Sequence, residues 1–161
     1  MIIIGIDPGS RRCGYGILKL EKYRIIEAGA GVIVLDSKKS LPEKLQLLGS
    51  ELRKILLEYK PDFASVENIF YGKSISSAFT LGHARGVILY CLSDLNIPIY
   101  SYTPKEIKLS VTGKGNASKQ QVEYMVQSIL RLSKPAKEDA ADALASALCL
   151  YNKEKGLGVR G

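Results

Sequence analysis

MIIIGIDPGSRRCGYGILKLE, residues 1–21, is the stretch that decides the fold class. Residues 1–7 form an apolar run without polar alternation, which is typical of a strand buried on both faces near the middle of a sheet. The segment PGSRR turns the chain, and residues 13–21 predict a second strand. Because the connection is so short, we expect the two strands to pair in antiparallel fashion.

Strand and helix patterns continue along the rest of the chain. RIIEAGAGVIVL (24–35) predicts a third strand, which completes an antiparallel meander. A capping box at Ser40 and Glu43 precedes leucines at helical spacing, so a helix is expected there. FASVE (63–67) follows this helical crossover and is expected to be a strand parallel to the first. Further patterns predict a helix over 76–94, a strand over 97–102, and helices that begin near residues 104, 118 and 138.

These patterns predict an α/β fold with a mixed five-stranded sheet flanked by helices. The patterns are not interrupted by an internal repeat or a linker, and a length of 161 residues suits one domain. We therefore expect residues 1–155 to form a single domain and residues 156–161 to be a flexible tail.

The charge balance of the chain favours a polyanionic partner such as nucleic acid. Lysine and arginine number 23 against 16 acidic residues, which gives a formal net charge of +7 at pH 7. The N-terminus lacks the basic region and long apolar stretch of a signal peptide, and no run of 18 apolar residues predicts a membrane span. Three widely spaced cysteines agree with a reducing compartment, so we expect a cytoplasmic protein.

Two acidic residues end predicted strands. Asp7 closes the first strand and Glu67 closes the fourth. If these strands are neighbours, the two carboxylates lie about 5 Å apart, which is the spacing between strands. Sites in open α/β sheets form at the carboxyl ends of strands. The alternatives are that Asp7 only forms a turn with Pro8 and Gly9, and that Glu67 is a solvated strand end.

A second pair of acids lies within KEDAADALA (137–145), in the last predicted helix. Asp139 and Asp142 are separated by about 4.5 Å along the helix axis and about 60° around it, so they share one flank. Their alanine neighbours would let the helix lie close to a sheet and direct both acids at one site. The alternatives are that the acids complement the helix dipole or that they face water.

If the four carboxylates converge, two divalent cations would balance their charge. Carboxylate oxygen suits Mg²⁺, with Mn²⁺ as a substitute. Two such ions in one site can activate water and stabilise the leaving oxygen of a phosphodiester. This combination predicts a metal-dependent nuclease.

Five motifs, in their order along the chain, resemble the RuvC family of bacterial Holliday-junction resolvases: IGIDPGSRRCGYGI, VENIFYGKS, LGHARGVI, KLSVTGKGNASKQQV and DAADALA. The resemblance implies a ribonuclease-H-like fold and a homodimer. It also implies Mg²⁺-dependent paired nicks in two opposed strands of a four-way DNA junction during recombination and repair. A further implication is a partnership with the RuvA–RuvB branch-migration complex.

The resemblance also assigns roles to single residues. The catalytic, metal-binding acids of the family fall on the four acids named above: Asp7, Glu67, Asp139 and Asp142. Some relatives carry histidine at the position of Asp139, where this chain keeps the acid.

The predicted DNA-binding residues are Phe70, Arg85, Lys105, Lys108, Lys114 and Lys119. Lys108 and Lys119 match family lysines that are associated with junction cleavage, and Phe70 matches an aromatic associated with the junction centre. The lysines surround the turn TGKGN, from which they could contact phosphates. The alternatives are a solvated face for the lysines and core packing for Phe70.

Three other functions remain open from the residues alone. The first is an actin-like kinase or ATPase, although 161 residues cannot supply its two domains. The second is a nuclease of the same fold that cuts flaps or RNA–DNA hybrids, and the third is a junction-binding module without catalysis. The apolar helix over 76–94 is the candidate dimer interface, with burial inside the monomer as the alternative. We expect His83, in that helix, to pack near the core.

Overall fold

The computed structural model describes residues 1–68 and 74–157, and for residues 155–157 it describes the backbone alone. Strands and helices in this part follow the predicted order. Their bounds are β1 Ile2–Asp7, β2 Arg12–Glu21, β3 Arg24–Val34, α1 Leu41–Tyr59, β4 Phe63–Glu67, α2 Ile75–Asp94, β5 Ile99–Tyr102, α3 Pro104–Thr112, α4 Lys119–Leu130 and α5 Glu138–Leu157.

The strands form one mixed sheet in the order β3-β2-β1-β4-β5. β1 pairs antiparallel with β2 and parallel with β4, and β4 pairs parallel with β5. The prediction of a mixed five-stranded sheet is confirmed. β1 lies in the middle of the sheet, which explains why its sequence is apolar on both faces.

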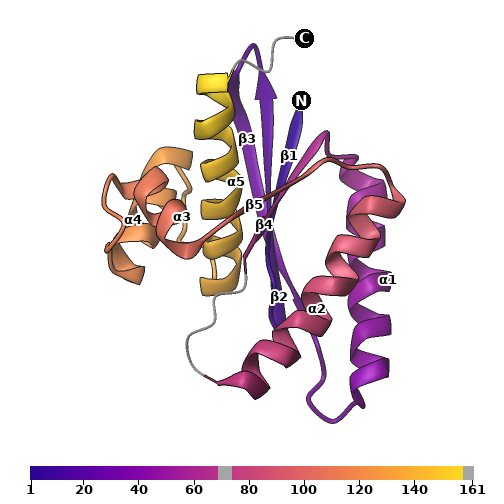
Figure 1. Ribbon diagram of the computed structural model, residues 1–161. Coiled ribbons are helices and arrows are strands. Elements are labelled where there is room, and N and C mark those ends of the chain that lie inside the picture. Colours follow the sequence, from indigo (N-terminus) through magenta and orange to yellow (C-terminus); the bar gives the residue numbers. More distant parts are fainter. Residues whose placement is uncertain (69–73, 158–161) are drawn as a thin grey trace.

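The sheet is sandwiched between two layers of helices (Figure 1). α1 and α2 cover one face, where Ile4 and Ile6 of β1 join their core. α5 covers the other face together with α3 and α4, and Ile3 of β1 joins that second core. Because strand side chains alternate between faces, Gly5 and Asp7 lie on the α5 side with Ile3.

Capping boxes define the starts of three helices. Ser40 and Glu43 cap α1, and Ser118 and Gln121 cap α4, as predicted. The structure adds a third box at Thr103 and Glu106, which begins α3. The caps of α3 and α4 begin two helices that pack beside α5.

A few expectations from the sequence differ from the structure. His83 lies on an exposed face of α2 and not near the core, because the buried side of that helix is formed by other positions. β5 begins two residues later than predicted, and α5 continues to Leu157.

Cys13, Cys91 and Cys149 are free and buried. Among the described residues, no helix is long and apolar enough to cross a membrane.

Candidate active site

Asp7 and Glu67 end adjacent parallel strands on the same face of the sheet. Gly5 of β1 pairs with Ser65 of β4, so the residues two positions further along each strand lie at the same edge. Strand alternation directs both carboxylates toward α5. The predicted meeting of these two acids is therefore built into the strand register.

Glycines in β1 and β2 allow the backbone of α5 to rest directly on the sheet. A Cβ atom on Gly14 would lie 1.9 Å from the carbonyl oxygen of Asp139, and one on Gly5 would lie 2.0 Å from that of Ala143. No side chain fits at either position. This close approach brings the first turns of α5, with Asp139 and Asp142, to the strand ends.

A buried hydrogen bond joins α5 to β4 beneath the acids. Ser65 Oγ and Ser146 Oγ lie 2.7 Å apart, and both residues are fully buried. Glu67 follows Ser65 by two residues on the same strand face, and Asp142 precedes Ser146 by one helical turn. The serine pair thus fixes α5 relative to the strand that carries Glu67. The sequence analysis missed it, because two isolated serines carry no periodic signal.

The pKa of Asp7 is affected by the charges of the other three acids. Burial raises the pKa of Asp7 to about 8, from an ordinary value of 3.8. Repulsion from the carboxylates of Glu67, Asp142 and Asp139 adds to this shift. The Asp7 carboxyl also donates a hydrogen bond to Glu67, which favours its protonated form.

The pKa values of Glu67 and Asp142 are also raised, with burial as the largest cause. Repulsion from Asp142 adds to the shift of Glu67, whereas the hydrogen bond from Asp7 and the charges of Lys119 and Lys108 oppose it. The charge of Lys119 is also the main influence that opposes the shift of Asp142. A buried carboxylate cluster of this kind attracts cations.

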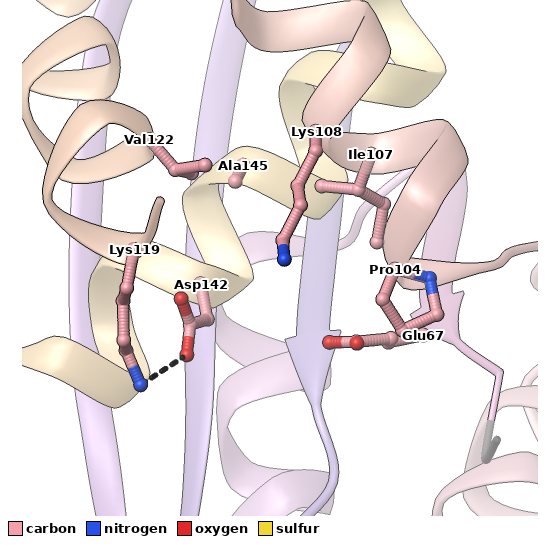
Figure 2. Close-up of a pocket in the computed structure, with 8 residues that line it drawn as sticks. All are labelled: Glu67, Pro104, Ile107, Lys108, Lys119, Val122, Asp142 and Ala145. Carbon is pink, nitrogen blue, oxygen red and sulfur yellow. Dashed lines mark ion pairs between the residues drawn. The ribbon is translucent and has the colours of Figure 1, made fainter. Parts of the chain in front are cut away.

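A cavity of about 590 Å³ opens between α3, α4 and α5 at this edge of the sheet. Glu67 and Asp142 line it together with the lysines Lys108 and Lys119. Figure 2 shows Lys108 pointing toward the space between the two acids and Lys119 beside Asp142. The cavity therefore combines carboxylates with ammonium groups, which suits a ligand that carries both phosphate and metal.

The predicted phosphate-binding lysines occupy different places. Lys119 forms ion pairs with Glu138 and, at 3.4 Å, with Asp142. Burial would lower the pKa of Lys119, but its contacts with these two acids outweigh burial and raise that pKa. Lys114 and Tyr124 are among the residues that line a second cavity. Lys105 is exposed and its side chain packs on Gly115.

Two predicted DNA-binding residues stand apart from these lysines. Arg85 is half-buried and donates hydrogen bonds to Glu67 and Asn68 at the end of β4 and to Ser101 of β5. Its position close to a catalytic candidate was not expected from the sequence. Phe70 lies outside the described residues.

Among residues 1–68 and 74–157, no three His, Cys, Asp or Glu side chains form a ready metal-binding group. Asp142 is paired with Lys119, and the Asp7 carboxyl donates a hydrogen bond to Glu67. The donor set itself fits Mg²⁺, because it consists of carboxylate oxygens whose mutual repulsion a cation would relieve.

Comparison with known proteins identifies the family. The family model "Crossover junction endodeoxyribonuclease RuvC" matches residues 3–150. The chain belongs to the RuvC family. A RuvC from Petrotoga mobilis is 45% identical over 153 residues, which cover 94% of each chain. A RuvC from Citrifermentans bemidjiense is 42% identical over 149 residues, which cover 92% of this chain and 91% of the relative.

A solved RuvC structure has the same fold. RuvC from Thermus thermophilus, in complex with a Holliday junction substrate, superposes with a TM-score of 0.86 at 28% identity. The match covers 97% of this chain and 96% of the Thermus chain. The predicted ribonuclease-H-like fold is therefore confirmed.

Proposed function

We propose that this RuvC protein is an endonuclease that resolves four-way DNA junctions, and that Asp7, Glu67, Asp139 and Asp142 bind its catalytic metal. The observation that carries the proposal is the shared electrostatics of these four acids, which come from three separate segments of the chain. Burying carboxylates that repel one another, without a cation between them, raises the free energy of the folded protein. A bound divalent cation would offset this cost.

Magnesium is the proposed cofactor, with Mn²⁺ as a substitute and two ions in each site. When bound, the ions would activate a water molecule and stabilise the leaving oxygen of the cut phosphodiester. The protein holds the acids in place through the β1–β4 register and the contact of α5 with the sheet glycines. Asp7 would lose its proton on metal binding, since a cation favours the ionised form.

Lys108 and Lys119 are proposed to hold the DNA backbone over the acids. Both line the same cavity as Glu67 and Asp142. Phosphate oxygens would replace Glu138 and Asp142 as partners of Lys119, and that exchange would free Asp142 for the metal. Lys105 and Lys114 are proposed to contact phosphates further along the DNA, because both are exposed around the same turn. Phe70 remains a proposed contact of the junction centre.

A homodimer is proposed for paired cutting, because a four-way junction has approximate two-fold symmetry. The proposed interface is the apolar stripe of α2, defined by Ile75, Phe79, Gly82, Gly86 and Tyr90, which lie three or four residues apart. The three large side chains are 60–67% exposed, and both glycines face open space. The opposite side of the helix already packs in the monomer core. Phe79→Asp should therefore give a folded monomer in analytical ultracentrifugation.

The proposed site of action is the bacterial cytoplasm, in agreement with three free cysteines. The RuvA–RuvB complex is the proposed partner that moves the junction. Co-sedimentation of the protein with RuvA–RuvB on a four-way junction tests this partnership. If the protein and RuvA–RuvB sediment separately when they are mixed with the junction, the partnership is contradicted.

The function is tested with an end-labelled mobile four-way junction, incubated with and without Mg²⁺ and analysed on a denaturing gel. We expect one nick in each of two opposed strands, and only when Mg²⁺ is present. Duplex, flap and RNA–DNA hybrid substrates run in parallel distinguish a resolvase from another nuclease of this fold. Equal cutting of all four substrates would contradict junction selectivity, and binding without cutting would indicate a non-catalytic module.

A further inference from the structure

We propose that Arg85 is a positioning residue, which holds the end of β4 so that the Glu67 carboxylate can share a metal ion with Asp7. The inference rests on the proposed function. It gives Arg85 a role inside the protein in place of the DNA contact that its motif first suggested.

The guanidinium of Arg85 bridges the ends of two neighbouring strands. Nε donates to the carbonyl oxygen of Glu67 at 3.3 Å, and Nη2 donates to Asn68 Oδ1 at 3.0 Å. Nη2 also donates to Ser101 Oγ of β5 at 2.9 Å. One side chain therefore contacts β4 and β5 at the strand edge where the acids lie.

The last residues of β4 need such support because the sheet ends beside them. The pairing of β1 with β4 extends to Ile6 opposite Val66. Pro8, which follows β1, has no N–H group and cannot extend that ladder. On the β5 side, the N–H of Asn68 still donates to the carbonyl of Tyr102 at 2.9 Å. Arg85 supplies a donor to the Glu67 carbonyl at this boundary.

Arg85 acts on the backbone from the face opposite the metal site. It belongs to α2, which covers the sheet face away from α5. The Glu67 side chain points toward α5 with Asp7, so the arginine can orient the residue without entering the site. An arginine suits this task because its charge is permanent and its planar fork reaches several acceptors together, which a lysine cannot do.

The competing role for Arg85 is direct contact with a DNA phosphate. Nε and Nη2 already donate three hydrogen bonds to protein acceptors, so a phosphate would have to bind Nη1 or displace these acceptors. The two roles predict different defects. Loss of a phosphate contact weakens junction binding and lowers its salt dependence, whereas loss of positioning weakens metal binding and slows cutting.

The experiment compares Arg85→Lys and Arg85→Ala with the control Arg53→Ala. Arg53 is also an arginine of the α1–α2 layer, but its guanidinium pairs with Asp94 at 2.6 Å, away from the acids. Three quantities are measured: the affinity for Mn²⁺ by calorimetry without DNA, the affinity for a four-way junction in EDTA at several salt concentrations, and kcat with its Mg²⁺ dependence.

We expect both Arg85 variants to bind Mn²⁺ about ten-fold or more weakly and to cut with a lower kcat. Junction affinity and its salt dependence should stay within about two-fold of wild type, and Arg53→Ala should change none of the three quantities. If the Mn²⁺ affinity of the Arg85 variants is unchanged, the proposal is overturned. This holds if their junction binding weakens, and it also holds if only their thermal stability falls.

Ser101→Ala keeps the proposal testable if Arg85→Ala does not fold. This substitution removes one acceptor of Arg85 and leaves the guanidinium itself in place. We therefore expect a loss of Mn²⁺ affinity that is smaller than the loss in the Arg85 variants. If neither Ser101→Ala nor Arg85→Lys lowers the Mn²⁺ affinity, the proposal is overturned. If the wild type binds Mn²⁺ but cuts no junction, the proposed function fails while the calorimetry still tests Arg85.

Discussion

The carbonyl oxygen of Asp139 lies directly over Gly14, in the space that a methyl group on Gly14 would need. This contact joins a backbone position of β2 to the first turn of α5. It sets how far the acids of α5 stand from the strand-end acids. The helix and the sheet therefore act as one rigid support for the carboxylate cluster.

Gly14→Ala tests this support. The added methyl group would displace the start of α5, which should lower the free energy of unfolding by about 1–3 kcal/mol and abolish junction cutting. Chemical denaturation and the gel assay measure the two effects. Gly29→Ala is the matched control in the same sheet, since nothing lies within 4 Å of its Cβ position. Full cutting by a folded Gly14→Ala protein would contradict the contact.

The buried pair Ser65 and Ser146 should behave as a coupled unit. Ser146→Ala leaves the Ser65 hydroxyl buried without a partner, which should cost about 1–3 kcal/mol. The double change to alanine should cost less than the sum of the single changes, because it leaves no polar group unpaired. A double-mutant cycle by urea denaturation measures this coupling. Additive costs would mean that the hydroxyls are independently satisfied.

The metal-free protein should lose stability as pH rises. The pKa of Asp7 is about 8 in the fold and ordinarily 3.8, so the unfolded chain ionises first. The stabilising contribution of the protonated Asp7 carboxyl is complete below pH 3.8 and is lost as pH rises through about 8. In EDTA at pH 8, Asp7→Asn should therefore raise the melting temperature by about 2–4 °C or more. Added Mg²⁺ should stabilise only the wild type, and an equal gain in both proteins would contradict metal binding at Asp7.

Lys108 should contribute to DNA binding without reading sequence. Lys108→Ala should reduce the slope of log affinity against log salt by about 1 on any four-way junction. Fluorescence anisotropy over a range of salt concentrations measures the slope. Lys54→Ala is the control, because Lys54 pairs with Glu51 on the exposed side of α1. An unchanged slope for Lys108→Ala would remove it from the phosphate-binding surface.

The fold and the positions of the four acids on its strands and last helix were predictable, because each has a local signal. The apolar run of β1 indicates a central strand, and Asp7 and Glu67 stand where such runs end. Asp139 and Asp142 are visible through their helical spacing. The antiparallel meander of β1, β2 and β3 and the parallel direction of β4 follow from the lengths of the connections, whereas the full strand order comes from the structure.

The supports of the site were not predictable because they depend on tertiary contacts. Gly14 matters through its distance to Asp139, and Ser65 matters through Ser146, which lies 81 residues away in the chain. Arg85 appeared as a surface cation in sequence, and only the fold shows its guanidinium against β4. Contacts between distant segments leave no periodic pattern in a single sequence.

The central claim is that the four acids jointly hold divalent cations against DNA. The most direct measurement is anomalous scattering from crystals of the protein grown with a four-way junction and Mn²⁺. We predict two Mn²⁺ peaks about 3.5–4 Å apart, both coordinated by this carboxylate cluster and both absent from Asp7→Asn crystals. Peaks that lie away from Asp7 and Glu67, or that persist in the Asp7→Asn protein, would contradict the account.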